Sequence, residues 1–419
     1  MSSTVITIPD EGEVPIKKKK FQVFLLPLIS IFREKKNNQE VKKLIHSIKV
    51  GIALVLVSLL YLLYPLYKQV GDNAMWAIMT VVVLFEFYAG ATLSKGFNRG
   101  IGTVLGGGLG CLAAAFAQNV GGIGNAIVVG FSVFIFGAAA TYSRLVPRIK
   151  KRYDYGAMIF ILTFNLVVVS GLRAENVLEL ARERLSTIFM GFAVCIFTSL
   201  LVFPTWASDE LHDSIASRIE DLARSIEGCS AEYFNSVGEK QNCSSANSNS
   251  CKSLLHSKAK DESLVYFAKW EPWHRKFGFS YPWEKYLKIG DVLRDLAATI
   301  LSLQGCLQSP IMCSETLLQS IKEPYTVIGS SLAWTLRELG ESIKKMKKCQ
   351  SENLMVQKLK SMRLELSQVK TLSTIGQMEN VDGLAIASSI FLLMKMIDKV
   401  EDLAKEIEEL GKLAGFHTK

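Results

Sequence analysis

Long apolar runs separated by short polar turns fill the first half of the chain. Six of these runs approach the roughly 20 residues that a helix needs to cross the hydrocarbon of a bilayer. They are Val50–Tyr67, Ala74–Ala91, Gly100–Gln118, Ile123–Tyr142, Tyr155–Gly171 and Leu185–Pro204. The pattern therefore predicts six transmembrane helices, which form a membrane domain over residues 48–205.

After Trp206 the apolar positions recur at the spacing of amphipathic helices, beginning with Leu211, Ile215 and Ile219. Later stretches repeat this period at residues 287–308, 314–349, 352–372 and 386–413. A Ser/Asn-rich stretch, residues 237–260, interrupts them and is expected to be a mobile loop. We therefore predict an all-α membrane protein in which the six spans precede a cytosolic helical bundle, residues 206–419.

Residues 1–47 are predicted to form a cytosolic arm with a basic run at Lys17–Lys20. The apolar segment that follows, Phe21–Phe32, is too short to cross a bilayer and contains Pro27, so an interfacial position is expected. The run is a topology signal or a lipid-binding patch. Lys and Arg are also frequent in alternate loops between the spans, which predicts cytosolic amino and carboxy termini.

Composition excludes several classes of function. The chain has 419 residues, 49% of them hydrophobic, and a net charge of +9, but no nucleic-acid-binding module accompanies the charge. Its 8 cysteines show no pairing framework and are expected to be free thiols. The 5 histidines are scattered, without HExxH or a nucleophile elbow. We therefore expect neither an enzyme nor a bound metal or cofactor.

Charged side chains lie within or at the ends of the predicted spans. Glu86 lies about two thirds of the way along the second span, where an ionised group needs a partner or water. It either holds a pore cation in place or forms a purely structural ion pair. The basic side chains are Lys95, Arg99, Arg144 and Arg184. Such residues often reach toward lipid headgroups, but a cluster of them would attract anions into a pore.

The third predicted span is dense in glycine. Gly102, Gly106 and Gly110 are spaced four apart, which favours close contact between helices. A phosphate-binding loop is excluded because GxxxxGK[ST] is absent and the glycines lie inside an apolar run. Basic groups beside closely packed helices are the ingredients of an anion path.

Several short motifs occur together in this chain. They are NAMWAIMTVVVLFEF (Asn73–Phe87), GATLSKGFNRG (Gly90–Gly100), YDYG (Tyr153–Gly156), ILTFNL (Ile161–Leu166), RLSTI beginning at Arg184 and WEP (Trp270–Pro272). In this combination the chain resembles the plant aluminium-activated malate transporter family of anion channels. The resemblance implies a homodimer with a pore along its axis, which passes malate and, in some members, chloride, nitrate or sulfate.

The resemblance also implies roles for individual residues. Lys95, Arg99, Arg144 and Arg184 match basic positions that line the pore in the family. Glu175 and Glu179 match acidic positions linked to extracellular aluminium in some members, and Asp72 is the acid of the short first outer loop. The expected partners are malate and other small anions, a second copy of the chain and membrane lipids.

The leading hypothesis is an anion channel of the plasma membrane, with the vacuolar membrane as the alternative location. A proton-coupled carrier or efflux protein for organic or aromatic acids is the second hypothesis, and Glu86 would then carry the proton. A third is a membrane-tethered scaffold whose helical domain binds other proteins. Currents, gradient-dependent uptake or a silent bilayer recording would distinguish these hypotheses.

Overall fold

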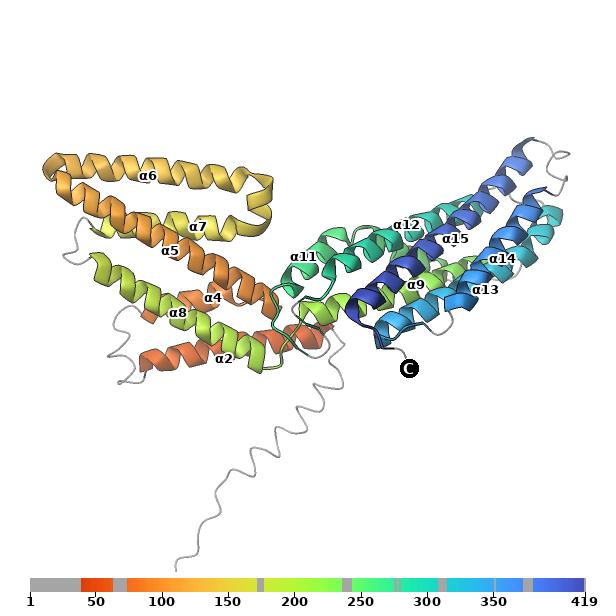
Figure 1. The fold of residues 1–419 in the computed structure, drawn as a ribbon, viewed down its shortest axis with the longest axis horizontal. Helices are drawn as coiled ribbons and strands as arrows, with labels where there is room; N and C mark the ends of the chain where they lie inside the picture. The colour runs from red at the N-terminus through yellow and green to blue at the C-terminus, as the bar shows by residue number, and fades with distance from the viewer. Residues whose placement is uncertain are drawn as a thin grey trace, which may run out of the picture. The chain divides into compact units, whose positions relative to one another are not determined.

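The computed structural model describes residues 39–62, 74–171, 177–235, 243–274, 277–278, 280–307, 315–349, 352–371 and 380–417. Within these ranges the regular structure is helical, and no β-strand occurs (Figure 1). The chain divides into two compact units. One comprises Met1–Phe85 and Leu178–Phe203, and the other comprises Glu86–Val177 and Pro204–Lys419.

The first unit contains α2 (Gln39–Leu62), α4 (Ala74–Leu84) and most of α8 (Val177–Leu201). Helices α2 and α4 pack against each other, and Ala53, Val57 and Val81 are buried. Helix α8 approaches α4 at Gly191, where an added Cβ would lie 2.7 Å from the Ala77 carbonyl oxygen. Glycine at this position therefore permits a close contact between two apolar helices.

The second predicted span, Ala74–Ala91, is too long. Helix α4 ends at Leu84, and α5 (Ala89–Val120) begins after a short non-helical connection that contains Glu86. The Thr92 hydroxyl oxygen accepts a 3.1 Å hydrogen bond from the Glu86 amide, which helps to define this connection. The sequence pattern also predicts a short basic turn with Lys95 and Arg99 between the second and third spans. This prediction is wrong, because both residues lie within α5, a helix of 32 residues. The polar side chains of this stretch suggested a turn. In the structure they belong to a part of α5 that packs on other segments of the protein and remains helical.

Helix α5 packs against α6 (Gly122–Leu145) and α7 (Pro147–Gly171), and the three lie side by side (Figure 1). Proline suits the first position of α7, where its missing N–H would have no helical partner. Among the described residues, these 3 helices are long and apolar enough to cross a membrane. Met75–Leu84 in α4 and Leu185–Leu201 in α8 are shorter apolar stretches. The remaining spans of the predicted six stay a prediction.

Glycines bring α5 and α7 into contact. A Cβ at Gly102 would lie 2.4 Å from the Gly156 carbonyl oxygen, and one at Gly106 would lie 2.7 Å from that of Phe160. These distances are shorter than any ordinary carbon–oxygen contact, so a larger residue would push the helices apart. The glycine spacing noted in the sequence therefore serves helix packing within this unit.

The helical domain, residues 206–417, consists of helices around one hydrophobic core. They are α9 (Ala207–Asn235), α10 (Cys243–Leu255), α11 (Lys258–Ala268), α12 (Trp283–Leu307), α13 (Glu315–Lys345), α14 (Glu352–Thr371) and α15 (Asn380–Ala414). Helix α9 packs on α13, and α12 packs on α15. The predicted helical periods at 287–308, 314–349, 352–372 and 386–413 are confirmed by α12 to α15.

The predicted loop at residues 237–260 is corrected where the structure describes it. Residues 237–242 lie outside the described residues, but Cys243–Leu255 form α10 and α11 begins at Lys258. Cys251 and Leu254 are buried in the core of the helical domain. This burial stabilises a helix that the Ser/Asn-rich composition alone does not favour.

The first turns of α5 pack on the helical domain within the same unit. A Cβ at Gly90 would lie 2.1 Å from the Phe267 carbonyl oxygen, so the two backbones meet directly. Ser94 donates a 2.8 Å hydrogen bond to the Tyr266 hydroxyl, and the rings of Phe97 and Trp270 lie 5.2 Å apart. This contact fixes the orientation of the part of α5 that carries Lys95 and Arg99.

Candidate functional site

The candidate site lies where the basic part of α5 faces the start of α7. Lys95 and Arg99 are four residues apart and therefore share one face of α5. The Lys95 ammonium forms a 2.5 Å ion pair with Glu86 and lies 5.3 Å from the centre of the Tyr155 ring. The carboxylate of Glu86 thus balances the charge of Lys95, as expected for a pore cation that is held in place or for a structural pair.

Arg99 differs from Lys95 because no carboxylate among the described residues accompanies it. Its exposed fraction is only 6%. Its Nη1 atom donates a 3.0 Å hydrogen bond to the hydroxyl of Tyr155, which is neutral, and its buried Nε has no hydrogen-bond partner. A buried cation without a counter-ion is costly, and an anion that binds to it removes part of that cost.

Thr103 adds a second donor one helical turn beyond Arg99. Its exposed fraction is 5%, and its hydroxyl has no hydrogen-bond partner within the described part of the chain. Buried hydroxyls usually find a partner, and in helices threonine often bonds the carbonyl four residues earlier. Arg99 and Thr103 therefore present two unused donors on the same face of α5.

Tyr155 belongs to the YDYG motif, but the motif does not indicate a contact with Arg99, and Thr103 is not distinguished by its sequence context. A tyrosine at the start of a span is common at membrane interfaces, and a lone threonine is well tolerated inside an apolar helix. The spacing of Thr103 from Arg99 is a usable signal, because a hydroxyl four residues from a cation on one helix lies on the same face.

Arg144 lies in the last turn of α6 and is paired with Asp154 of α7. Its Nε and Nη2 atoms donate hydrogen bonds of 2.8 Å and 3.3 Å to the two carboxylate oxygens. Both side chains are about one third exposed. This pair links two consecutive helices. Arg144 therefore has a carboxylate partner and, unlike Arg99, is not a cation without a counter-ion.

The other predicted site residues cannot be placed. Asp72 and Glu175 lie outside the described residues. Glu179 and Arg184 belong to α8, but their side chains lie outside the described residues. Among the described residues, no group of three or more His, Cys, Asp or Glu side chains could hold a metal ion. The described site is thus a small set of donors on α5 with Tyr155 of α7.

Comparison with known proteins agrees with the motifs. The sequence pattern of the family described as aluminium activated malate transporter matches residues 35–371. Aluminum-activated malate transporter 13 of Arabidopsis thaliana is 42% identical over 363 residues, which cover 84% of this chain and 67% of that protein. Aluminum-activated malate transporter 12 of the same plant is 44% identical over 318 residues, covering 75% and 57%.

A wheat relative extends the comparison. Aluminum-activated malate transporter 1 of Triticum aestivum is 34% identical over 395 residues, which cover 90% of this chain and 84% of that protein. This chain spans about three fifths to two thirds of the length of the two Arabidopsis relatives. The relatives are named as transporters, and none of these names describes an enzyme. The agreement over most of the chain shows that it belongs to the aluminium-activated malate transporter family.

Proposed function

We propose that this chain forms an anion channel that passes malate and small inorganic anions through a basic pore. The observation that carries the proposal is the buried Arg99 guanidinium, which has a neutral partner and an unused Nε donor. Basic groups that lack a local counter-ion create the field that admits anions and rejects cations. Relatives named as malate transporters supply the substrate class.

In this mechanism Arg99 attracts the anion, and the Thr103 hydroxyl donates to it one turn further along α5. Tyr155 accepts a hydrogen bond from Nη1 of Arg99, which orients the guanidinium and leaves Nε free. Lys95 and Glu86 form a neutral pair, so Lys95 contributes less to the field. An anion held by few donors can leave again, which conduction requires.

The proposal includes two copies of the chain with the pore at their shared axis. Large apolar side chains of α6, such as Ile127, Phe131 and Phe134, are exposed in a single copy. Lipid or a second copy would cover them. The plasma membrane is the proposed location, with the vacuolar membrane as the alternative and both termini in the cytosol.

Patch-clamp recording with anions exchanged on each face of the membrane tests the proposal. Arg99→Gln is expected to lower the malate and chloride currents by about tenfold or more, the effect of a charge-assisted interaction. Arg99→Lys keeps the charge and should retain a larger part of the current. Lys344→Gln, an exposed lysine of the helical domain, is the control. Unchanged currents in Arg99→Gln at equal surface expression would refute the role of Arg99 in the pore.

A proton-coupled carrier is the second candidate function. The pairing of Glu86 with Lys95 favours it, because protonation of the carboxylate would break the ion pair. Uptake would then saturate, depend on a proton gradient and disappear in Glu86→Gln. Currents that persist in Glu86→Gln without a proton gradient would exclude the carrier and leave the channel.

A further inference from the structure

A polar cavity lies in the helical domain, apart from the α5 site. Its volume is about 390 Å³, and residues of α9, α10 and α11 and the turn between the last two line it. Pockets for small ligands commonly begin at about 300 Å³. Serine hydroxyls are the most frequent lining groups: Ser214, Ser225, Ser250, Ser253 and Ser257. A purely structural gap between helices would instead be lined by apolar side chains.

The charged side chains of the lining are mostly basic. Arg218 and Lys260 line the cavity, whereas Asp221 is its single carboxylate. Asp221 forms an ion pair with Arg224, so its negative charge is already balanced. Lys260 is paired in the same way, because its Nζ lies 3.8 Å from a Glu210 carboxylate oxygen, so Arg218 is the basic lining group on which anion binding would depend.

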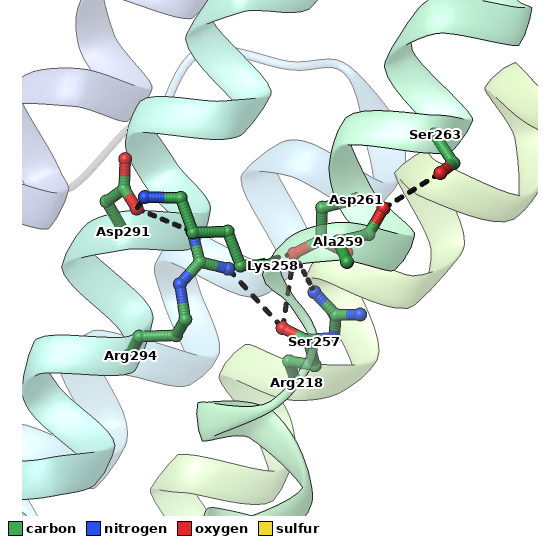
Figure 2. A network of polar contacts seen from close by, with 8 residues as sticks. All are labelled: Arg218, Ser257, Lys258, Ala259, Asp261, Ser263, Asp291 and Arg294. Atoms are coloured by element: carbon green, nitrogen blue, oxygen red, sulfur yellow. Dashed lines mark hydrogen bonds and ion pairs between the residues drawn. The ribbon is translucent and has the colours of Figure 1, made fainter. Parts of the chain in front are cut away.

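Arg218 belongs to a buried network beside the cavity (Figure 2). Two guanidinium groups share one carboxylate: Arg218 and Arg294 lie 2.8 Å and 3.0 Å from the same oxygen of Asp261. Arg294 has a second carboxylate, because its Nη2 lies 2.6 Å from Asp291. For Arg218 no second carboxylate is found among the described residues. The charge of Arg218 is therefore only partly neutralised, and the exposed fraction of its side chain is 14%.

Ser257 connects the network to the cavity. Its hydroxyl donates a 3.2 Å hydrogen bond to the same Asp261 oxygen and belongs to the cavity lining. Asp261 is fully buried and is also bonded by Ser257 and Arg294, so it holds the Arg218 guanidinium in one position. A guanidinium held in this way loses little conformational entropy when it binds a ligand.

We propose that this cavity binds a small oxyanion, a phosphate or a carboxylate, as a ligand separate from the transported anion. Arg218 supplies the main charge contact through the part of its guanidinium that does not bind Asp261. Lys260, whose Nζ lies 3.8 Å from Glu210, turns toward the ligand, and lining hydroxyls such as that of Ser214 donate hydrogen bonds to its oxygens. The same hydroxyls accept hydrogen bonds from hydroxyl groups of the ligand, so a hydroxylated oxyanion suits the cavity better than a halide.

Calorimetric titration of the full chain in lipid nanodiscs tests this proposal. Inorganic phosphate and malate are the two probes, and all variants carry Arg99→Gln to suppress binding at the α5 site. Arg218→Gln should weaken the binding of at least one probe by about tenfold, the effect of one charge-assisted contact. The probe that is affected identifies the ligand as a phosphate or a carboxylate.

Two further variants keep the test decisive. Lys260→Gln combined with Ser253→Ala changes exposed lining residues, so it should weaken binding without unfolding even if Arg218→Gln disturbs Asp261. Lys258→Gln is the matched control: it removes a lysine that faces Asp291 and does not line the cavity. Absence of saturable binding in the Arg99→Gln background, or equal affinity in the two cavity variants and the Lys258→Gln control, would overturn the proposal.

Discussion

Three basic side chains that look equivalent in the sequence have different electrostatic surroundings. Lys95 is paired with Glu86, and Arg144 is paired with Asp154 of the next helix. Arg99 has only the hydroxyl of Tyr155. Since paired charges largely cancel, Arg99 is the one of these three whose charge is not balanced by a carboxylate among the described residues. The sequence predicts all three as candidates but cannot rank them, because the partners of each depend on the register between helices.

The substitution Thr103→Val tests whether the Thr103 hydroxyl contributes to the anion current or only to the stability of the protein. Valine has nearly the same shape but lacks the hydroxyl, which has no hydrogen-bond partner within the described structure. We expect the malate current to fall about threefold to tenfold, because one donor to the anion is lost. The melting temperature should stay the same or rise, since a buried unsatisfied polar group is removed. Lower stability together with unchanged current would show that Thr103 has only a structural role.

Glu271 provides a test of pH dependence. Its carboxylate accepts hydrogen bonds from the amides of Ala207 and Ser208 and from the Ser208 hydroxyl, at the start of α9. Burial nevertheless raises the pKa of Glu271 above its ordinary value of 4.5. The folded state therefore binds this proton more tightly, and its contribution to stability is present below pH 4.5 and lost as pH rises through the folded pKa.

Glu271→Gln should remove this contribution. The measurement is the free energy of unfolding of wild type and variant from about pH 4 to pH 7. Their difference should decline with increasing pH, even though carboxylates with lowered pKa values, such as Glu227 and Glu401, change both curves in the opposite direction. A difference that does not vary with pH would contradict the expectation.

Among the elements, α5 and α7 form the contact on which the site depends. Gly102 and Gly106 allow the backbones to meet, and Asn98 donates a 2.9 Å hydrogen bond to the Arg152 carbonyl. Tyr155 lies at the same end of α7 as Arg152. The distance from Arg99 to Tyr155 is therefore set by glycines that do not contact either side chain.

Gly102→Ala should disturb this geometry. The added Cβ would lie 2.4 Å from the Gly156 carbonyl oxygen, so α5 and α7 must separate. We expect a loss of about 1–3 kcal/mol in stability, typical of overpacking, and a reduced anion current. Gly100→Ala is the control, because nothing lies within 4 Å of a Cβ there. Equal stability and current in the two variants would show that the contact is not required.

Periodicity predicts the helices of the helical domain well, because each has a continuous apolar face. It fails where composition and packing disagree. The break at residues 85–88 interrupts an apolar run without a proline or glycine, and it depends on the Thr92 contact. Similarly, α10 is rich in Ser and Asn, and its helix depends on the burial of Cys251 and Leu254. Such tertiary effects are not visible in a local sequence window.

At the scale of the whole molecule, part of the apolar half shares a compact unit with the helical domain. Helices α5 to α7 belong to that unit, whereas α2, α4 and most of α8 belong to the other. The sequence separates the apolar half from the polar half, but it does not predict this grouping. The contacts responsible join distant residues, such as Ser94 and Tyr266, which are 172 positions apart.

A double-mutant cycle on Phe97 and Trp270 measures the connection between α5 and the helical domain. Their rings lie 5.2 Å apart in a tilted arrangement. We expect a coupling energy of about 0.5–1.5 kcal/mol between Phe97→Ala and Trp270→Ala, the usual range for aromatic pairs. The readouts are the free energy of unfolding and the voltage of half-maximal current. Strictly additive effects on both would indicate that the two rings do not transmit changes between the segments.

The length of α5 has a consequence for where the proposed channel would bind its anions. Its 32 residues extend about 48 Å, whereas the hydrocarbon layer is about 30 Å thick, so roughly a third of the helix stands in the aqueous or headgroup zone. The first turns of α5, at Gly90, Ser94 and Phe97, contact the helical domain. The part of α5 that extends beyond the hydrocarbon layer is therefore expected at its amino-terminal end. In the proposed channel Arg99 would therefore lie near the surface of the bilayer, where an arriving anion still keeps part of its hydration shell.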